Sequence, residues 1–327
     1  MTLQQVWADL EKQGAETGAY RRRIHPEAVV DLYLVVHKPE NSRGLLVDVD
    51  LSGVELGELP AGRGVDLRWV TGTGGHPAIE LVLAQPAFRD LFDALVTDVA
   101  ETAALATDAG DAAQRVAERM RRWQTFLKTS GSGLSGERQR GLYGELYFLS
   151  KVLTGRVPTE AAVESWKGPY RARQDFSFGT FAVEVKTTVA NLHQNLRISS
   201  ERQLDTTPLP RGLDLFHLSV DGRPGAGQTL PEIVAEVRGK IGSSAQFEDS
   251  LFAAGYLDAQ AVAYVTGYTV REANVFRVTE SFPRLQEKDC PNGVAEVTYS
   301  VAVSALGPFL IDVGQLLASI GTAGADV

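Results

Sequence analysis

Two acidic residues and a lysine stand close together in QDFSFGTFAVEVKTT, residues 174–188. Two runs of alternating apolar and polar residues flank Gly179, which suits the first position of a tight type II′ hairpin turn. The alternation then places Asp175 opposite Glu184 on one face of the hairpin, with Lys186 two residues further along. Two carboxylates directly across a hairpin repel each other, and a divalent cation between them would relieve that repulsion. The segment therefore predicts an acidic metal site with an ammonium group beside it.

Carboxylate oxygens of this kind suit Mg²⁺, which binds proteins through one or two carboxylates, waters and a substrate phosphate. Lys186 would lie beside the ion, where an ammonium can orient an attacking water or stabilise charge on the phosphate. Glu184-Val185-Lys186 is the only place where an acid stands two residues before a lysine. One such spacing is expected by chance in a chain of this composition, so the motif acquires weight only through its neighbours.

A helix expected at residues 136–154 supplies a third acid. Its apolar stripe consists of Leu142, Leu146, Leu149 and Leu153. Glu145 lies beside this stripe, where a carboxylate is costly unless it is paired or binds a metal. Taken alone, Glu145 is better explained as a boundary residue that reaches solvent or pairs with an arginine. Together with the hairpin, it is better explained as an additional acidic ligand.

An acid on a helix, followed by Asp…Glu-x-Lys on a hairpin, resembles the αβββαβ core of the PD-(D/E)XK nuclease superfamily. The segments GLYGELYFL, ESWKGP, QDFSF and VEVKTT are similar to those of a group of uncharacterised PD-(D/E)XK-motif proteins. Such proteins are often found in bacterial restriction and phage-defence gene clusters. The resemblance covers residues 136–220 and implies a Mg²⁺-dependent DNA endonuclease, with Mn²⁺ able to substitute.

The resemblance also implies roles for individual residues. Asp175 and Glu184 would hold Mg²⁺, Lys186 would position the nucleophilic water, and Glu145 would support this ion or a second one. Gln174 departs from the proline that nominally precedes the first aspartate. That position is variable in the superfamily, so the departure leaves the carboxylate chemistry intact.

Three further residues are candidates for the site or its surroundings. Relatives often carry an extra polar residue after the third strand, which makes Gln203 a candidate accessory residue. His193 lies in a loop near the site and could contact phosphate, although a plain surface histidine explains it better. Trp166 fits a core anchor better than a platform for base stacking.

Positive charge is concentrated in one part of an acidic chain. The 32 Lys+Arg and 41 Asp+Glu give a net charge of −9, which excludes a basic coat over the whole protein. Residues 111–173 nevertheless hold twelve Lys/Arg and six Asp/Glu. This excess suits either a solvated helix face or a surface that faces phosphates. The candidate DNA-contacting residues are Arg121, Arg122, Lys128, Arg138, Arg140, Arg171 and Arg173.

Other kinds of chemistry find little support. The TGTGG stretch at 71–75 fits a glycine hairpin, because no GK[ST] follows it as in a phosphate-binding loop. A single cysteine, Cys290, excludes an intramolecular disulfide framework, and the histidines are too scattered for a zinc site. We expect a cytoplasmic protein, because the sequence shows neither a signal peptide nor 18 consecutive apolar residues.

The expected fold class is α/β (α+β), with a restriction-endonuclease-like αβββαβ core. The 327 residues would divide into an N-terminal β-rich region (1–105), a helical lead-in with the nuclease-like core (106–225) and a C-terminal α+β region (226–327). The expected partners are DNA, proteins of a defence complex and a second copy in a homodimer, with no membrane. The alternative function is a non-catalytic nucleic-acid-binding or assembly subunit, which the acidic net charge favours.

Overall fold

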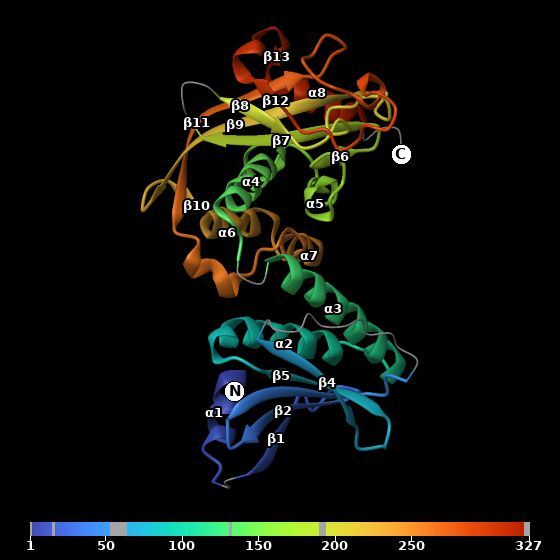
Figure 1. Cartoon of the computed structure of the whole chain (residues 1–327), viewed down its shortest axis with the longest axis vertical. Coiled ribbons are helices and arrows are strands. Elements are labelled where there is room, and N and C mark those ends of the chain that lie inside the picture. The colour runs from blue at the N-terminus through green and yellow to red at the C-terminus, as the bar shows by residue number, and fades with distance from the viewer. Residues whose placement is uncertain (1, 15–16, 53–63, 131–132, 190–193, 324–327) are drawn as a thin grey trace. The chain divides into compact units, whose positions relative to one another are not determined.

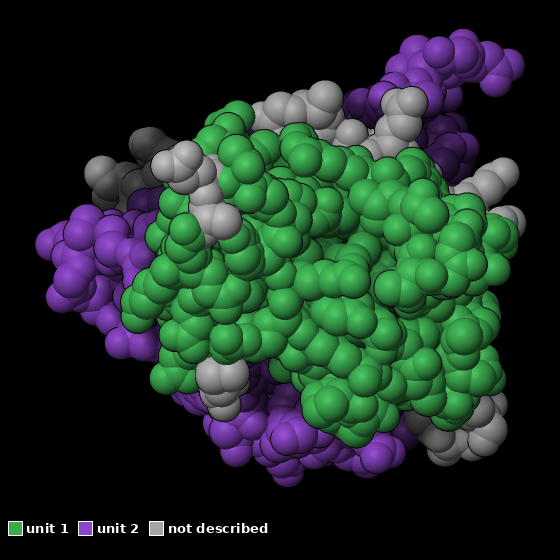
Figure 2. All heavy atoms as spheres, turned by 90° about the horizontal axis from the view of Figure 1, so that it is seen from below, with its two compact units in different colours: residues 1–132 green, residues 133–327 purple. Residues whose placement is uncertain are grey.

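The computed structural model describes residues 2–14, 17–52, 64–130, 133–189 and 194–323. The chain divides into two compact units, residues 1–132 and 133–327 (Figures 1 and 2). This division differs from the three expected regions for two reasons. The helix that leads into the core packs with the first unit, and strands beyond residue 226 complete the sheet of the second.

The first unit is an antiparallel five-stranded sheet with strand order β1-β2-β3-β5-β4. Its most buried face carries alternate residues such as Leu32, Leu34, Leu45 and Leu81, which contact solvent nowhere. The glycine hairpin expected at 71–75 is confirmed, because it joins β4 to β5. The elements are α1 (Leu3–Glu11), β1 (Gly18–Ile24), β2 (Asp31–Lys38), β3 (Ser42–Asp48), β4 (Val65–Thr71), β5 (Pro77–Leu83), a 3-10 turn (Pro86–Phe88), α2 (Arg89–Ala104) and α3 (Ala109–Ser130).

The second unit is built on a mixed sheet with order β10-β11-β9-β7-β6, to which β13 adds by pairing with β11. Strands β7 and β9 are parallel, and the other pairs are antiparallel. The strands are β6 (Phe176–Phe178), β7 (Phe181–Val189), β8 (Asn195–Ile198), β9 (Gly212–Pro224), β10 (Gln228–Thr229), β11 (Thr266–Arg277), β12 (Tyr299–Ala302) and β13 (Leu310–Ile311).

The helices of this unit are α4 (Gly136–Tyr147), a π-helix that continues it (Phe148–Leu153), α5 (Thr159–Ser165), α6 (Leu230–Ile241), α7 (Ala245–Ala254) and α8 (Val313–Ala323). Short 3-10 turns are Gly168–Tyr170, Asp258–Ala263, Glu287–Asp289, Val303–Ala305 and Gly307–Phe309. Helices α4 and α6 lie on the opposite side of the sheet from β8 and β12 (Figure 1). No helix among the described residues is long and apolar enough to cross a membrane.

Two hydrophobic clusters cover the two faces of the sheet. The larger one joins helices α4 to α8 to the sheet, and its aromatic members include Phe148, Trp166, Phe176 and Phe216. The smaller one joins the other face to β8 and β12, through residues such as Leu196 and Leu215. The sheet thus has buried residues on both faces, and the mixed α/β class expected from the sequence is confirmed.

Two details differ from the expected elements. The strand expected at 195–200 is present as β8 but pairs with β12 in a separate two-stranded sheet, so it does not extend the main sheet. The separate strands expected at 261–268 and 273–279 are one long strand, β11, preceded by a 3-10 turn. A bulge between Val270 and Glu272 lets β11 continue along β9 without ending.

Candidate active site

The hairpin of β6 and β7 has the register expected from its alternating sequence. Phe178 pairs with Phe181, and Phe176 pairs with Val183. Gly179 has φ 63°, which the first central position of a type II′ turn requires and which glycine adopts without strain. The phenylalanines and valines of one face lie in the larger hydrophobic cluster. The expected apolar face of the hairpin is therefore confirmed.

Asp175 lies where the ladder between the two strands ends. Its Oδ2 accepts a hydrogen bond from the backbone N–H of Val185 at 2.8 Å, so a side chain takes the place of the next ladder bond. Its backbone oxygen accepts from the N–H groups of Lys167 and Gly168, at 2.7 and 3.0 Å. Because both the side chain and the backbone are held, the Asp175 carboxylate is fixed at the edge of β7.

Glu184 and Lys186 project from β7 on the face opposite the helices. The Glu184 residue is only 1% exposed, and its Oε1 lies 2.7 Å from Nζ of Lys186. Its other oxygen, Oε2, is buried and has no hydrogen-bond partner among the described residues. A buried oxygen without a donor is costly, so this carboxylate is poised to accept a further partner.

Glu145 reaches the same place from α4. Its Oε2 accepts a hydrogen bond from the indole Nε1 of Trp166 at 2.6 Å. Helix α4 comes close enough because Gly144 faces Thr187 of β7, where an added Cβ would lie 1.7 Å from Oγ1. Gly168 leaves similar room, since a Cβ there would lie 2.6 Å from Glu145 Oε2 and 3.0 Å from an oxygen of Asp175. Two glycines therefore permit the convergence of the acidic groups.

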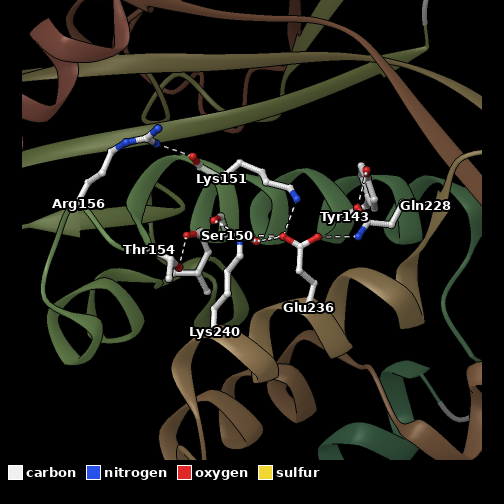
Figure 3. Close-up of polar contacts among 9 residues, drawn as sticks. Tyr143, Ser150, Lys151, Thr154, Arg156, Gln228, Glu236 and Lys240 are labelled. Carbon is white, nitrogen blue, oxygen red and sulfur yellow. Dashed lines mark hydrogen bonds and ion pairs between the residues drawn. The ribbon is translucent and has the colours of Figure 1, made fainter.

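A polar network holds the helix that carries Glu145 (Figure 3). Glu236 of α6 accepts hydrogen bonds from Ser150 at 2.7 Å and from Lys151 at 2.5 Å, both on the π-helix that continues α4. Lys240 pairs with Glu236 at 2.8 Å and also donates to the backbone oxygen of Ser150. Burial opposes the charge of Glu236, but these donors outweigh it and lower its pKa. The network fixes α4 and its extension against α6.

Burial and mutual repulsion make the charged form of the site's carboxyl groups unfavourable. Burial, and next the charge of Asp175, raise the pKa of Glu184 to about 8. The same two causes raise the pKa of Glu145, and burial raises that of Asp175. Burial opposes the ammonium of Lys186, but the charges of Glu184 and Asp175 outweigh it and raise the pKa of Lys186. The single ammonium of Lys186 cannot neutralise three carboxylates. The site therefore favours the binding of a further positive charge.

Gln203, which we named from the sequence as a candidate accessory residue, also lies at the site. Its Oε1 accepts hydrogen bonds from Nζ of Lys186 at 3.1 Å and from the backbone N–H of Ser199 at 2.8 Å. Gln174, at the nominal proline position, donates to the backbone oxygen of Gln203 at 3.1 Å. A glutamine at 174 therefore secures the turn that holds Gln203 against Lys186.

These side chains line a pocket of about 500 Å³. Of the basic residues named from the sequence, Arg140 lines it, and the buried Nε of Arg140 has no partner among the described residues. Arg197, an exposed residue of β8, adds a second guanidinium that the sequence did not single out. The sequence reasoning also missed Trp166 as the donor to Glu145, and Thr188 and Gln194 as lining residues.

The other basic candidates lie elsewhere. Arg121 and Arg122 are on α3 of the first unit, where Arg122 pairs with Glu118 at 3.0 Å. In the second unit, Arg138 donates to the backbone oxygen of Ala254. Arg171 and Arg173 are exposed in the chain that leads to Asp175. Lys128 is also on α3, but its side chain is outside those described, and His193 lies outside the described residues.

The donor set suits an oxygen-loving divalent cation. One oxygen of each carboxylate already has a partner, which is Trp166 for Glu145, the Val185 amide for Asp175 and Lys186 for Glu184. The second oxygen of each makes no hydrogen bond to the described residues. No three acidic, histidine or cysteine side chains in the described ranges already form a metal cage. The buried orphan oxygen of Glu184 and the raised carboxyl pKa values nevertheless fit residues that would hold Mg²⁺.

The comparison with protein families agrees with this geometry. The family model described as "Putative PD-(D/E)XK family member, (DUF4420)" matches residues 3–304. The chain therefore belongs to this family, and the match confirms the PD-(D/E)XK resemblance. No curated protein matches the chain, and no solved structure does.

Proposed function

We propose that this protein is a Mg²⁺-dependent endonuclease that hydrolyses phosphodiester bonds of DNA. The observation that carries the proposal is the convergence of Glu145 from α4, Asp175 from the residue before β6 and Glu184 from β7 on one pocket that Lys186 also lines. A structural protein gains nothing from burying three acids together, because each raises the cost of the others.

The residues of the chain have distinct roles in this proposal. Asp175, Glu184 and Glu145 would hold the cation, which would supply positive charge to the phosphate as its negative charge develops. Lys186 remains protonated beside Glu184, so it acts as a hydrogen-bond donor that orients the attacking water or contacts a phosphate oxygen. The oxygen of the attacking water bonds to phosphorus as that water gives up one proton to the surrounding solvent, one P–O ester bond breaks, and the departing oxygen takes up a proton. Gln203 fixes the position of the Lys186 ammonium.

The biological setting is part of the same proposal. Membership of the family and its resemblance to proteins of defence gene clusters support a role as the nuclease component of a restriction or phage-defence system. Cutting both strands at once requires two such sites, which a homodimer would supply. Mn²⁺ should replace Mg²⁺, because it also accepts carboxylate and water ligands.

The rival function is a non-catalytic nucleic-acid-binding or assembly subunit. The net charge of −9 favours it, because a nuclease that acts alone generally presents more positive surface. The presence of all three acids and Lys186 favours catalysis, since a subunit that only assembles has no need of the complete set.

The test is a cleavage assay on linear, circular and single-stranded DNA with Mg²⁺ or Mn²⁺. The wild type should cut at least one of these substrates, and Glu184→Ala and Lys186→Ala should not, although both remain folded by circular dichroism. Cleavage by both variants at the wild-type rate would refute the site. Binding without cleavage by the wild type would favour the assembly subunit.

A further inference from the structure

Three hydrogen-bonded side chains, two of which line the pocket of the carboxylates, have no part in the steps described above. Nε2 of His217 on β9 lies 2.8 Å from Oγ1 of Thr188 on β7. The same hydroxyl donates to Oε1 of Gln194 at 2.6 Å, just before β8 begins. Thr188 and Gln194 both line the pocket that contains Lys186. The three residues thus connect the interior of the sheet to the pocket.

The direction of each hydrogen bond in this series follows from the chemistry of the groups. A threonine hydroxyl has a single hydrogen, and here it is directed to Gln194. Its oxygen therefore accepts from His217, which must carry a hydrogen on Nε2. Burial lowers the pKa of His217 to about 4, so the ring is neutral near pH 7 and has only that one hydrogen. Consistently, Nδ1 of the fully buried ring has no partner among the described residues.

This arrangement decides which end of the Gln194 carboxamide remains available. Its oxygen is taken by Thr188, and its nitrogen makes no hydrogen bond to the residues that the structure describes. A carboxamide nitrogen donates and does not accept, so it complements a negatively charged oxygen. Arg140 and Arg197 line the same pocket and favour an anion there. Phosphate oxygens are the anionic groups of a nucleic acid.

We propose that the Gln194 carboxamide donates a hydrogen bond to a non-bridging phosphate oxygen of the nucleic-acid substrate, and that Thr188 and His217 are the positioning residues that orient it. This inference rests on the proposed function and adds to it a substrate-binding residue outside the Asp…Glu-x-Lys motif. Without the Thr188 hydroxyl, the carboxamide is free to rotate, and its oxygen would then face the phosphate in part of the population.

Binding of a short DNA duplex tests the inference. All variants carry Glu184→Gln, so that binding is measured without turnover. Gln194→Glu should raise the Kd about tenfold or more, since it removes a donor to a charged group and adds a negative charge. Asn292→Asp, an exposed amide-to-acid change outside the pocket, is the matched control and should leave the Kd within about twofold. Thr188→Val should raise the Kd several-fold, and Thr188→Ser should restore it.

A neutral methylphosphonate, placed at one phosphate of the duplex at a time, tests the contact itself. At one position, the methylphosphonate should raise the Kd of the protein that has Gln194. At that same position it should leave the Kd of Gln194→Leu unchanged. If Gln194 had only a structural role, the methylphosphonate at each position would change the Kd of both proteins by the same factor. That result would overturn the inference. So would an unchanged Kd for Gln194→Glu.

These outcomes are separable from the proposed function, because cleavage is measured independently with Glu184 intact. A wild type that cuts DNA while Gln194→Glu binds normally refutes only the role of Gln194. A wild type that neither binds nor cuts DNA refutes both.

Discussion

The indole Nε1 of Trp166 lies 2.6 Å from Oε2 of Glu145, so a residue of the hydrophobic core also donates a hydrogen bond to the acidic site. Trp166 is only 1% exposed, and its ring packs against Phe247 with the ring centroids 5.8 Å apart. Its role as a core anchor, expected from the sequence, is confirmed. The same residue orients one of the three carboxylates.

Trp166→Phe should therefore weaken the binding of Mg²⁺ at the site by more than the loss of folding stability alone would explain. The substitution removes the donor that lowers the pKa of Glu145, so the carboxyl group holds its proton more firmly and binds a cation less well. We expect the Mg²⁺ concentration for half-maximal cleavage to rise several-fold, with excess Mg²⁺ restoring the rate.

Trp123→Phe is the matched control for this change. Trp123 is also buried, and its Nε1 donates to Asp98 at 2.6 Å in the first unit. It should cost similar stability without altering the Mg²⁺ dependence. An equal shift in both variants would show that Trp166 acts only through folding.

The free energy of unfolding in EDTA should fall as pH rises. The pKa of Glu184 is raised from 4.5 to about 8 in the folded protein, so between these values the folded state holds a proton that the unfolded state has lost. The contribution of Glu184 to stability is then greatest below its pKa in the unfolded chain. It decreases as pH rises and is lost once pH passes the pKa of Glu184 in the folded protein. Each tenfold difference in proton affinity corresponds to about 1.4 kcal/mol.

Urea unfolding at several pH values across this window measures the effect. Glu184→Gln should flatten the decline, whereas Glu272→Gln, at an exposed position on β11, should not. A wild-type stability that rises with pH, or parallel curves for the wild type and Glu184→Gln, would contradict the raised pKa.

Gly168→Ala should disturb the site while leaving the fold intact. The new Cβ would lie 2.6 Å from Glu145 Oε2 and 3.0 Å from an oxygen of Asp175, so one or both carboxylates must move. We expect cleavage to fall at least tenfold, with a loss of about 1–3 kcal/mol in stability from overpacking. Gly239→Ala is the control, because nothing lies within 4 Å of its Cβ on α6. It should stabilise that helix by up to about 1 kcal/mol and leave cleavage unchanged.

Reversing Arg121 and Arg122 to glutamate should weaken DNA binding more at low salt than at high salt. Phosphate contacts release counterions, so each contact that is lost reduces the slope of affinity against salt. A titration of labelled duplex at several salt concentrations measures this slope. Equal affinity of the wild type and the double variant at low salt would exclude α3 from the DNA-binding surface.

The hairpin and the helix were predictable because their signals are local. Alternation, Gly179 and a leucine stripe place Asp175, Glu184 and Glu145 without knowledge of the rest of the fold. The Trp166–Glu145 bond and the Thr188–His217 bond could not be predicted, since they depend on segments 21 and 29 residues apart in the chain. The separation of β8 from the main sheet was missed for the same reason, because its partner β12 lies about a hundred residues later.

Cation binding to the folded protein tests the central claim most directly. Calorimetric titration of the wild type with Mn²⁺ near pH 8, with no nucleic acid present, should show saturable binding and a raised Tm. Glu184→Gln should lose most of this affinity while remaining folded, and Glu272→Gln should keep it. Wild-type protein that binds no divalent cation, or a Glu184→Gln variant that binds it equally well, would contradict the assignment of these carboxylates as its ligands.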